Sequence, residues 1–86
     1  DRAFSDCPKI VALLANEMIR GLQGGGVAAC AKHFPGHGAT SVDSHLALPV
    51  LSTDLHTIFE RELLPFKSAL LAEVATIMTA HVVAPC

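Results

Sequence analysis

The chain has 86 residues, a formal net charge of −2 and a pI near 6.2, so it has no basic surface of the kind that attracts nucleic acid or anionic lipid. Its apolar runs are far shorter than the ~20 residues of a membrane helix, which indicates no membrane-spanning segment. A hydrophobic content of 51% is high for a short chain, because small domains expose much of their surface, and we expect residues 1–86 to be an internal fragment of a single larger domain.

The first expected element is an amphipathic helix over residues 8–22. Its apolar side chains recur at spacings of three and four residues, while the polar and charged ones fall mostly on the opposite side. Ser5 or Asp6 is the expected N-cap, with Pro8 in the first turn. The run of three glycines at 24–26 is expected to end the helix, since glycine is typical of helix C-termini.

A short strand is expected next, over residues 27–32. This run is small and apolar without alternation, which is typical of a strand covered on both faces in a parallel sheet. Cys30 lies inside it and is expected to be an unpaired thiol in the core. A loop then extends from about His33 to Leu51, and its length and its Gly, Ser, Asp and His content indicate a functional segment.

The second half of the chain is expected to form a helical stretch and another strand. Ser52 or Thr53 is the expected cap of the helix. Pro65 then either kinks this helix or begins a second short one. Residues 74–80 are rich in apolar and β-branched side chains, which predicts a second buried strand, and His81 follows at its C-terminal end.

The expected order is therefore helix, strand, loop, helix, strand. Parallel strands joined by a helix form β-α-β units, which build either open doubly wound sheets or closed eight-stranded barrels. Two strands cannot close a barrel, so the segment needs neighbouring strands on both sides. In both architectures functional residues gather at the C-terminal ends of the strands, which makes Lys32, His33 and His81 candidate site residues.

Three histidines, one lysine and one aspartate lie within the fourteen residues from Lys32 to His45. A metal site is one interpretation, because His33 and His37 are four residues apart and His45 could complete a set of three ligands. Pro35 and two glycines prevent the helix that would bring the first two histidines onto one face, which disfavours this interpretation. The glycines that flank His37 match neither phosphate-binding fingerprint, so a phosphate-binding loop is also disfavoured.

Asp43 and His45 form a candidate acid/base pair. One residue separates them, so in an extended segment both side chains project to the same side and can hydrogen-bond. An aspartate beside an imidazole fixes its tautomer and favours its protonated form, as a general acid requires near neutral pH. The alternative is that Asp43 caps a local turn while His45 is an exposed loop residue.

The segment from Lys32 to Pro49 resembles the signature of family 3 glycoside hydrolases of the β-N-acetylglucosaminidase (β-N-acetylhexosaminidase) type. That signature reads approximately KHFPGHG-x-T-x-x-DSH-x-x-LP, and the match is long and specific. On its two sides, Asp1 to Phe4 resembles the D/N-R-[SA]-F turn of the family, and Ile77 to Val82 resembles its IM-[TP]-AHV strand. The resemblance thus covers essentially all 86 residues.

The resemblance implies an α/β fold that is part of a (β/α)8 TIM-type barrel, with a helix-strand-loop-helix-strand order. It implies a retaining glycosidase that hydrolyses terminal β-linked N-acetylglucosamine without a metal or an organic cofactor. Carried over by residue, His45 would act as general acid and then as general base, with Asp43 as its partner. The residues that would contact the carbohydrate substrate are Lys32, His33, Arg2 and His81.

The resemblance also implies a downstream aspartate as the nucleophile, and no aspartate of this chain follows a strand in such a position. Retaining hydrolysis needs two groups on opposite faces of the anomeric carbon, so the isolated segment is expected to be inactive. The expected substrates are cell-wall muropeptides or chitin-type sugars, in the cytoplasm or at the cell envelope of a bacterium. The alternatives are a non-catalytic carbohydrate-binding barrel and a β-glucosidase-type relative, the second of which the Asp-Ser-His sequence argues against.

Overall fold

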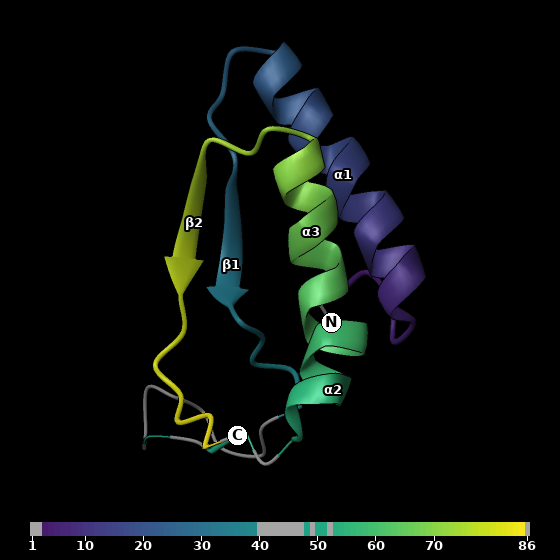
Figure 1. The fold of residues 1–86 in the computed structure, drawn as a ribbon. Coiled ribbons are helices and arrows are strands. Elements are labelled where there is room, and N and C mark those ends of the chain that lie inside the picture. The colour runs from purple at the N-terminus through teal and green to yellow at the C-terminus, as the bar shows by residue number, and fades with distance from the viewer. Residues whose placement is uncertain (1–2, 40–47, 49, 52, 86) are drawn as a thin grey trace.

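The computed structural model describes residues 3–39, 48, 50–51 and 53–85 (Figure 1). It confirms the expected order of helix, strand, loop, helix and strand. In chain order the elements are α1 (Pro8–Gly24), β1 (Cys30–Phe34), α2 (Leu55–Thr57), the π-helix η1 (Ile58–Glu62), α3 (Leu63–Leu71) and β2 (Thr76–Thr79). None of the helices in these ranges is long and apolar enough to cross a membrane.

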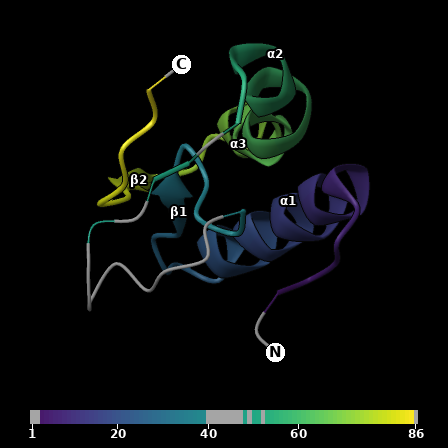
Figure 2. The same ribbon diagram turned by 90° about the horizontal axis from the view of Figure 1, so that it is seen from below.

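β1 and β2 pair in parallel and form a two-stranded sheet. Cys30 lies opposite Thr76 and Lys32 lies opposite Met78, and the register shifts between Lys32 and Phe34. The two long helices, α1 and α3, lie side by side on the same face of this sheet, which gives two layers (Figure 1 and Figure 2). The structure therefore confirms the β-α-β arrangement, in which a helical stretch connects two neighbouring parallel strands.

The core lies between the two helices and the sheet, and it is built largely from small side chains. Ile19 of α1, Ala29 just before β1 and Ala69 of α3 form its centre, with exposed fractions of 6%, 4% and 2%. Because alanine has only a methyl group, the helices approach the sheet closely at these points. A larger side chain at either alanine would overpack the two layers.

Hydrogen bonds also join α1 to α3. The Asn16 amide donates to the Ser68 carbonyl oxygen at 3.0 Å, and the Ser68 hydroxyl donates to the Ala12 carbonyl oxygen at 3.1 Å. These bonds link residues that are 52 and 56 positions apart in the chain. Because a partly buried polar group is costly to leave unpaired, they favour one alignment of the two helices.

The beginning of α1 differs from the prediction. Cys7 is the N-cap residue, and its side chain makes no capping hydrogen bond. Ser5 Oγ instead accepts from the Cys7 N–H at 3.0 Å, which forms a turn before the helix, and Asp6 is exposed. Pro8 does lie in the first turn as predicted, where its missing N–H costs no intrahelical bond.

The glycine run ends α1 as predicted. The residues that follow it also place the start of β1 later in the sequence than predicted. Gly26 has a φ of +88°, a backbone conformation that favours glycine, and the Val27 N–H donates back to the Leu22 carbonyl oxygen at 2.9 Å. Residues 25–28 therefore lead the chain out of the helix. As a result the strand begins at Cys30 and not at Val27, and it continues to Phe34.

Burial of the strands also differs from the prediction. Within the part of the chain that the structure describes, helices cover only one face of the sheet, and Met78 of β2 is 50% exposed. The prediction that Cys30 lies in the core is wrong, because its thiol is exposed. Ala29 and Ala31 pack toward the helices, and successive strand residues point to opposite faces, so Cys30 points to the uncovered one.

Asp54, and not the predicted Thr53, caps the second helical stretch, and Ser52 lies outside the described residues. The Asp54 carboxylate accepts a hydrogen bond from the Thr57 N–H at 2.7 Å. This bond stabilises the charged carboxylate and holds the pKa of Asp54 below its ordinary value. Aspartate is among the residue types preferred at an N-cap, since its oxygen reaches a helical N–H that has no intrahelical acceptor.

Pro65 lies in the first turn of α3 without interrupting the helical stretch. The π-helix η1 precedes it, and the Leu63 N–H donates to the carbonyl oxygen of Ile58, five residues back. In a regular helix a proline ring crowds the carbonyl oxygen four residues earlier, which here is that of Arg61 in the wider π turn. Pro65 therefore does not begin a separate helix as one of the two predictions had it, because the helical residues run without a gap from Leu55 to Leu71 and α3 starts two residues before it.

Gln23, near the end of α1, connects this helix to the starts of both strands. Its Oε1 accepts from the N–H groups of Ala29 (3.3 Å) and Ala75 (2.8 Å). Its Nε2 donates to the Glu73 carbonyl oxygen (3.1 Å). One side chain therefore satisfies three backbone groups at the N-terminal edge of the sheet.

Gln23→Ala should lower the free energy of unfolding by about 1–2 kcal/mol, because it removes the partner of three backbone groups at once. Denaturant titration measures the loss. Glu17→Ala is the matched control, since Glu17 is exposed on the same helix and its replacement should change stability by less than ~0.5 kcal/mol. Equal effects of the two substitutions would contradict the bridging role of Gln23.

Candidate functional site

The C-terminal ends of β1 and β2 lie at the same edge of the sheet, as expected for parallel strands (Figure 1). Lys32 and His33 lie in the last part of β1, and His81 follows shortly after the end of β2. The Ala80 N–H donates to the Phe34 carbonyl oxygen at 2.8 Å, which continues the contact between the two segments beyond β2. The fold therefore brings three of the predicted site residues to one edge.

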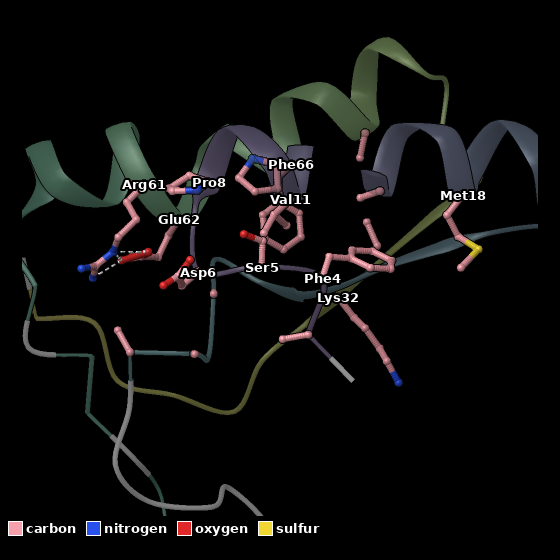
Figure 3. A pocket seen from close by; sticks show the side chains of 18 of the residues that line it. Phe4, Ser5, Asp6, Pro8, Val11, Met18, Lys32, Arg61, Glu62 and Phe66 are labelled. Carbon is pink, nitrogen blue, oxygen red and sulfur yellow. Dashed lines mark hydrogen bonds and ion pairs between the residues drawn. The ribbon is translucent and has the colours of Figure 1, made fainter. Parts of the chain in front are cut away.

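Lys32 faces away from the helices. Its neighbour Ala31 packs against the core, so alternation along the strand turns Lys32 to the uncovered face of the sheet. The Lys32 side chain is exposed and extends away from the interior of the nearby cavity (Figure 3). An ammonium group in this position can reach a ligand on the uncovered face.

His33 and His37 lie near each other where the chain leaves β1. Their ring centroids are 6.3 Å apart, and their planes are inclined by 59°. His33 is exposed, while the Nε2 atom of His37 is buried. The peptide bonds Lys32–His33 and Phe34–Pro35 on either side are both cis.

A metal site involving these histidines is not formed by the described residues alone. Among residues 3–39, 48, 50–51 and 53–85, no three His, Cys, Asp or Glu side chains are grouped so that they could hold a metal ion. His45, the third histidine of the set considered above, lies outside these ranges. The expected absence of a metal therefore stays a prediction.

Asp43, His45 and Arg2 all lie outside the described residues. The acid/base roles of Asp43 and His45 and the sugar contact of Arg2 therefore stay predictions. The far end of the same loop is anchored at Leu51, which is fully buried and whose N–H donates to the Val83 carbonyl oxygen at 2.7 Å. This bond attaches the end of the loop to the segment that follows β2.

The structure adds two residues that the sequence analysis did not select, Arg61 and Glu62 at the end of η1. The Glu62 carboxylate accepts from Arg61 Nε at 2.6 and 2.7 Å, and this interaction raises the pKa of Arg61 above its ordinary value. The Glu62 side chain is 9% exposed and lies against Gly36. The one signal in the sequence is Gly36 itself, because a glycine often marks a point where another group approaches the backbone closely.

A cavity of about 750 Å³ lies between residues 3–6, α1, α3 and the segment that follows β1 (Figure 3). Its wall is mostly apolar and includes Phe4, Met18 and Phe66. Lys32 also contributes to its lining, although the end of the Lys32 side chain extends away from the cavity interior. Its polar lining residues are Ser5, Asp6, Lys32, Arg61 and Glu62.

Comparison with known sequences identifies relatives along the whole chain. The profile of the Glycosyl hydrolase family 3 N terminal domain matches residues 1–86. A protein named Beta-hexosaminidase from Thioalkalivibrio sulfidiphilus is 49% identical over 86 residues, a match that covers 96% of this chain and 24% of the relative. A Beta-hexosaminidase from Xylella fastidiosa is 41% identical over 85 residues, which covers 99% of this chain and 25% of the relative. The chain therefore spans about a quarter of the length of these relatives.

Solved structures resemble the chain over nearly the same range. NagZ from Neisseria gonorrhoeae, in complex with N-trifluoroacetyl-D-glucosamine, matches with a TM-score of 0.91 and 43% identity, over 98% of this chain and 25% of that one. Zinc-bound CbsA from Thermotoga neapolitana matches with a TM-score of 0.93 and 42% identity, over 98% of this chain and 19% of that one. The arrangement of helices around the two-stranded parallel sheet thus occurs within both larger proteins.

Proposed function

The chain belongs to glycosyl hydrolase family 3, and from this membership we propose that it is part of a retaining β-N-acetylhexosaminidase that acts on terminal β-linked N-acetylglucosamine. The observation that carries the proposal is the match of all 86 residues to the N-terminal domain of that family. Two relatives that are 41% and 49% identical are named beta-hexosaminidases. The common edge that holds Lys32, His33 and His81 agrees with this, because barrel enzymes carry their active sites at the C-terminal ends of the strands.

In this proposal residues 1–86 are an internal part of a single (β/α)8 TIM-type barrel domain. Helices cover one face of the sheet, and the other face carries apolar side chains such as the half-exposed Met78. Strands added on both sides would pair the two edges of the sheet and enclose that face as the barrel interior. Lys32 would then point into the barrel near its carboxyl end.

The acid/base chemistry is assigned to His45 with Asp43 as its partner. A protonated imidazole donates its proton to the leaving oxygen and later removes one from the attacking water. The carboxylate beside it fixes the tautomer and stabilises the imidazolium. The nucleophile is an aspartate outside this chain, because a retaining reaction needs a second group on the opposite face of the sugar. The 86 residues alone are therefore inactive.

Sugar binding is assigned to the polar residues at the strand ends. Hydrogen bonds to hydroxyl groups that strengthen in the transition state contribute to glycoside hydrolysis. The N-acetyl sugar as substrate is supported by the neighbour that binds N-trifluoroacetyl-D-glucosamine. Muropeptides and chitin-type sugars are the natural substrates in this proposal, and no metal or organic cofactor takes part. The residues assigned to sugar binding are Lys32, His33, Arg2 and His81.

The proposal is tested by assaying the full-length protein with aryl β-N-acetylglucosaminides and with the matching β-glucosides. We expect hydrolysis of the N-acetyl sugar with retention of anomeric configuration, followed by NMR, and unchanged rates after treatment with a chelator. Preference for the glucoside would favour a β-glucosidase-type enzyme. Binding without turnover of either substrate would favour a non-catalytic barrel. Loss of activity in chelator, restored by zinc, would instead support a metal site formed by the histidines.

A further inference from the structure

Gly36, four residues after Lys32, is in close contact with the side chain of Glu62. A Cβ atom added to Gly36 would lie 2.8 Å from Glu62 Cγ and 3.1 Å from Glu62 Cβ. Gly36 also has a φ of +143°, a conformation that L side chains rarely adopt. The backbone at the start of the loop therefore rests directly on the two methylene positions of Glu62.

Glu62 is itself held in a fixed position. Its side chain is 9% exposed, and its carboxylate accepts from Arg61 Nε at 2.6 and 2.7 Å (Figure 3). Side chains at consecutive positions of a regular α-helix point in different directions and do not pair in this way. Here both residues end the π turn η1, and their pairing leaves the carboxylate neutralised next to the loop.

Arg61 reaches the other end of the same loop. Its Nη2 donates to Thr53 Oγ1 in a long hydrogen bond of 3.5 Å, just before the cap of the second helical stretch. Phe66, one turn further along the helix, packs edge to face on Phe34 with ring centroids 5.2 Å apart. All three contacts come from one short stretch of helix.

We propose that Arg61 and Glu62 are positioning residues that hold the two ends of the loop between Gly36 and Thr53. This loop carries Asp43 and His45, so the inference rests on the proposed function. The pair touches neither sugar nor leaving group in this role. It fixes Gly36 and Thr53, the described residues on either side of the segment with Asp43 and His45, and a displacement of about 1 Å in an active site can cost roughly 100-fold in rate.

The test uses the full-length protein with Glu62→Ala, which removes both the methylene contact and the carboxylate. We expect kcat/KM to fall about 10–100-fold for N-acetylglucosaminides with poor leaving groups and less than about 3-fold for those with activated phenols. An activated phenol needs little protonation, so it does not depend on the placement of the acid. A variant that is merely less folded would lose activity equally with every substrate, and equal losses would overturn the inference.

Two further variants separate contact from charge and from general helix effects. Glu62→Gln keeps the methylene groups and an oxygen that accepts from Arg61, and we expect it to restore rates to within about 3-fold of the wild type. A glutamine variant as slow as the alanine variant would contradict the role of the contact. Glu60→Ala, at an exposed position in the same π turn, should behave as the wild type. If the wild-type protein hydrolyses no N-acetylglucosaminide, the proposed function fails; if it does and Glu62→Ala shows no leaving-group dependence, only this inference fails.

Discussion

His45→Gln in the full-length protein should slow the hydrolysis of substrates with poor leaving groups by roughly 10²–10⁴-fold, the usual size of a general acid/base contribution. The imidazolium donates the proton that a poor leaving group needs when the glycosidic bond breaks. Glutamine has a similar size and can donate a hydrogen bond, but it cannot transfer a proton. An activated phenol leaves as a stable anion without protonation. The first step of substrates that carry such a leaving group should therefore be affected much less.

The measurement is the rate as a function of leaving-group pKa, for His45→Gln and for two comparison variants. Asp43→Asn should give a milder loss with the same dependence, because it weakens the support of the imidazolium without removing the imidazole. Lys32→Ala should weaken catalysis for all leaving groups alike, since a contact to a sugar hydroxyl does not sense the aglycone. Equal losses for His45→Gln across good and poor leaving groups would exclude the acid/base role.

Gly36→Ala should lower the free energy of unfolding by about 2–4 kcal/mol, the combined size of left-handed backbone strain and local overpacking. The added methyl group would lie 2.8 Å from Glu62 Cγ, and the φ of +143° is unfavourable for alanine at any packing. Glu62 cannot easily move aside, because its side chain is almost buried and paired with Arg61. Thermal and denaturant unfolding of the full-length protein measure the change.

Gly38→Ala is the matched control for this substitution. Gly38 lies two residues further along the same segment, and a Cβ there would meet no atom of the described residues within 4 Å, so stability should change by less than ~0.5 kcal/mol. The double variant Gly36→Ala with Glu62→Ala removes the crowded atom but keeps the backbone strain, so its loss should be smaller than the sum of the two single losses. Strict additivity of the two would show that the contact does not cause the effect.

The candidate site could be predicted in part from the sequence. Lys32, His33 and His81 were expected at one edge because the C-terminal ends of parallel strands meet there, and the pairing of β1 with β2 confirms that location. Their roles, and those of Asp43 and His45, rest on the motif and stay predictions. The sequence analysis did not select Arg61 and Glu62, because they contact Thr53 and Gly36 only in the folded chain. No spacing in the sequence predicts these contacts.

By itself the sequence determined the order of the elements and the end of α1. Helical periodicity and a glycine run act over a few neighbouring residues, so these features are local and can be read from the chain. The family likewise follows from a continuous motif, and the comparison with known sequences confirms it.

Only the tertiary structure decided the bounds and burial of the strands, the position of the caps and the close contact between Gly36 and Glu62. Cys30 is an example: its apolar neighbours predict a buried thiol, but the helices pack on the other face of β1, so the thiol is exposed within the part of the chain that the structure describes. The covered face of β1 is the one on which Ile19 of α1 and Ala69 of α3 pack against Ala29, and Ala69 is 40 positions away along the chain. Packing between such distant segments selects one face and one register from several that local propensity allows almost equally.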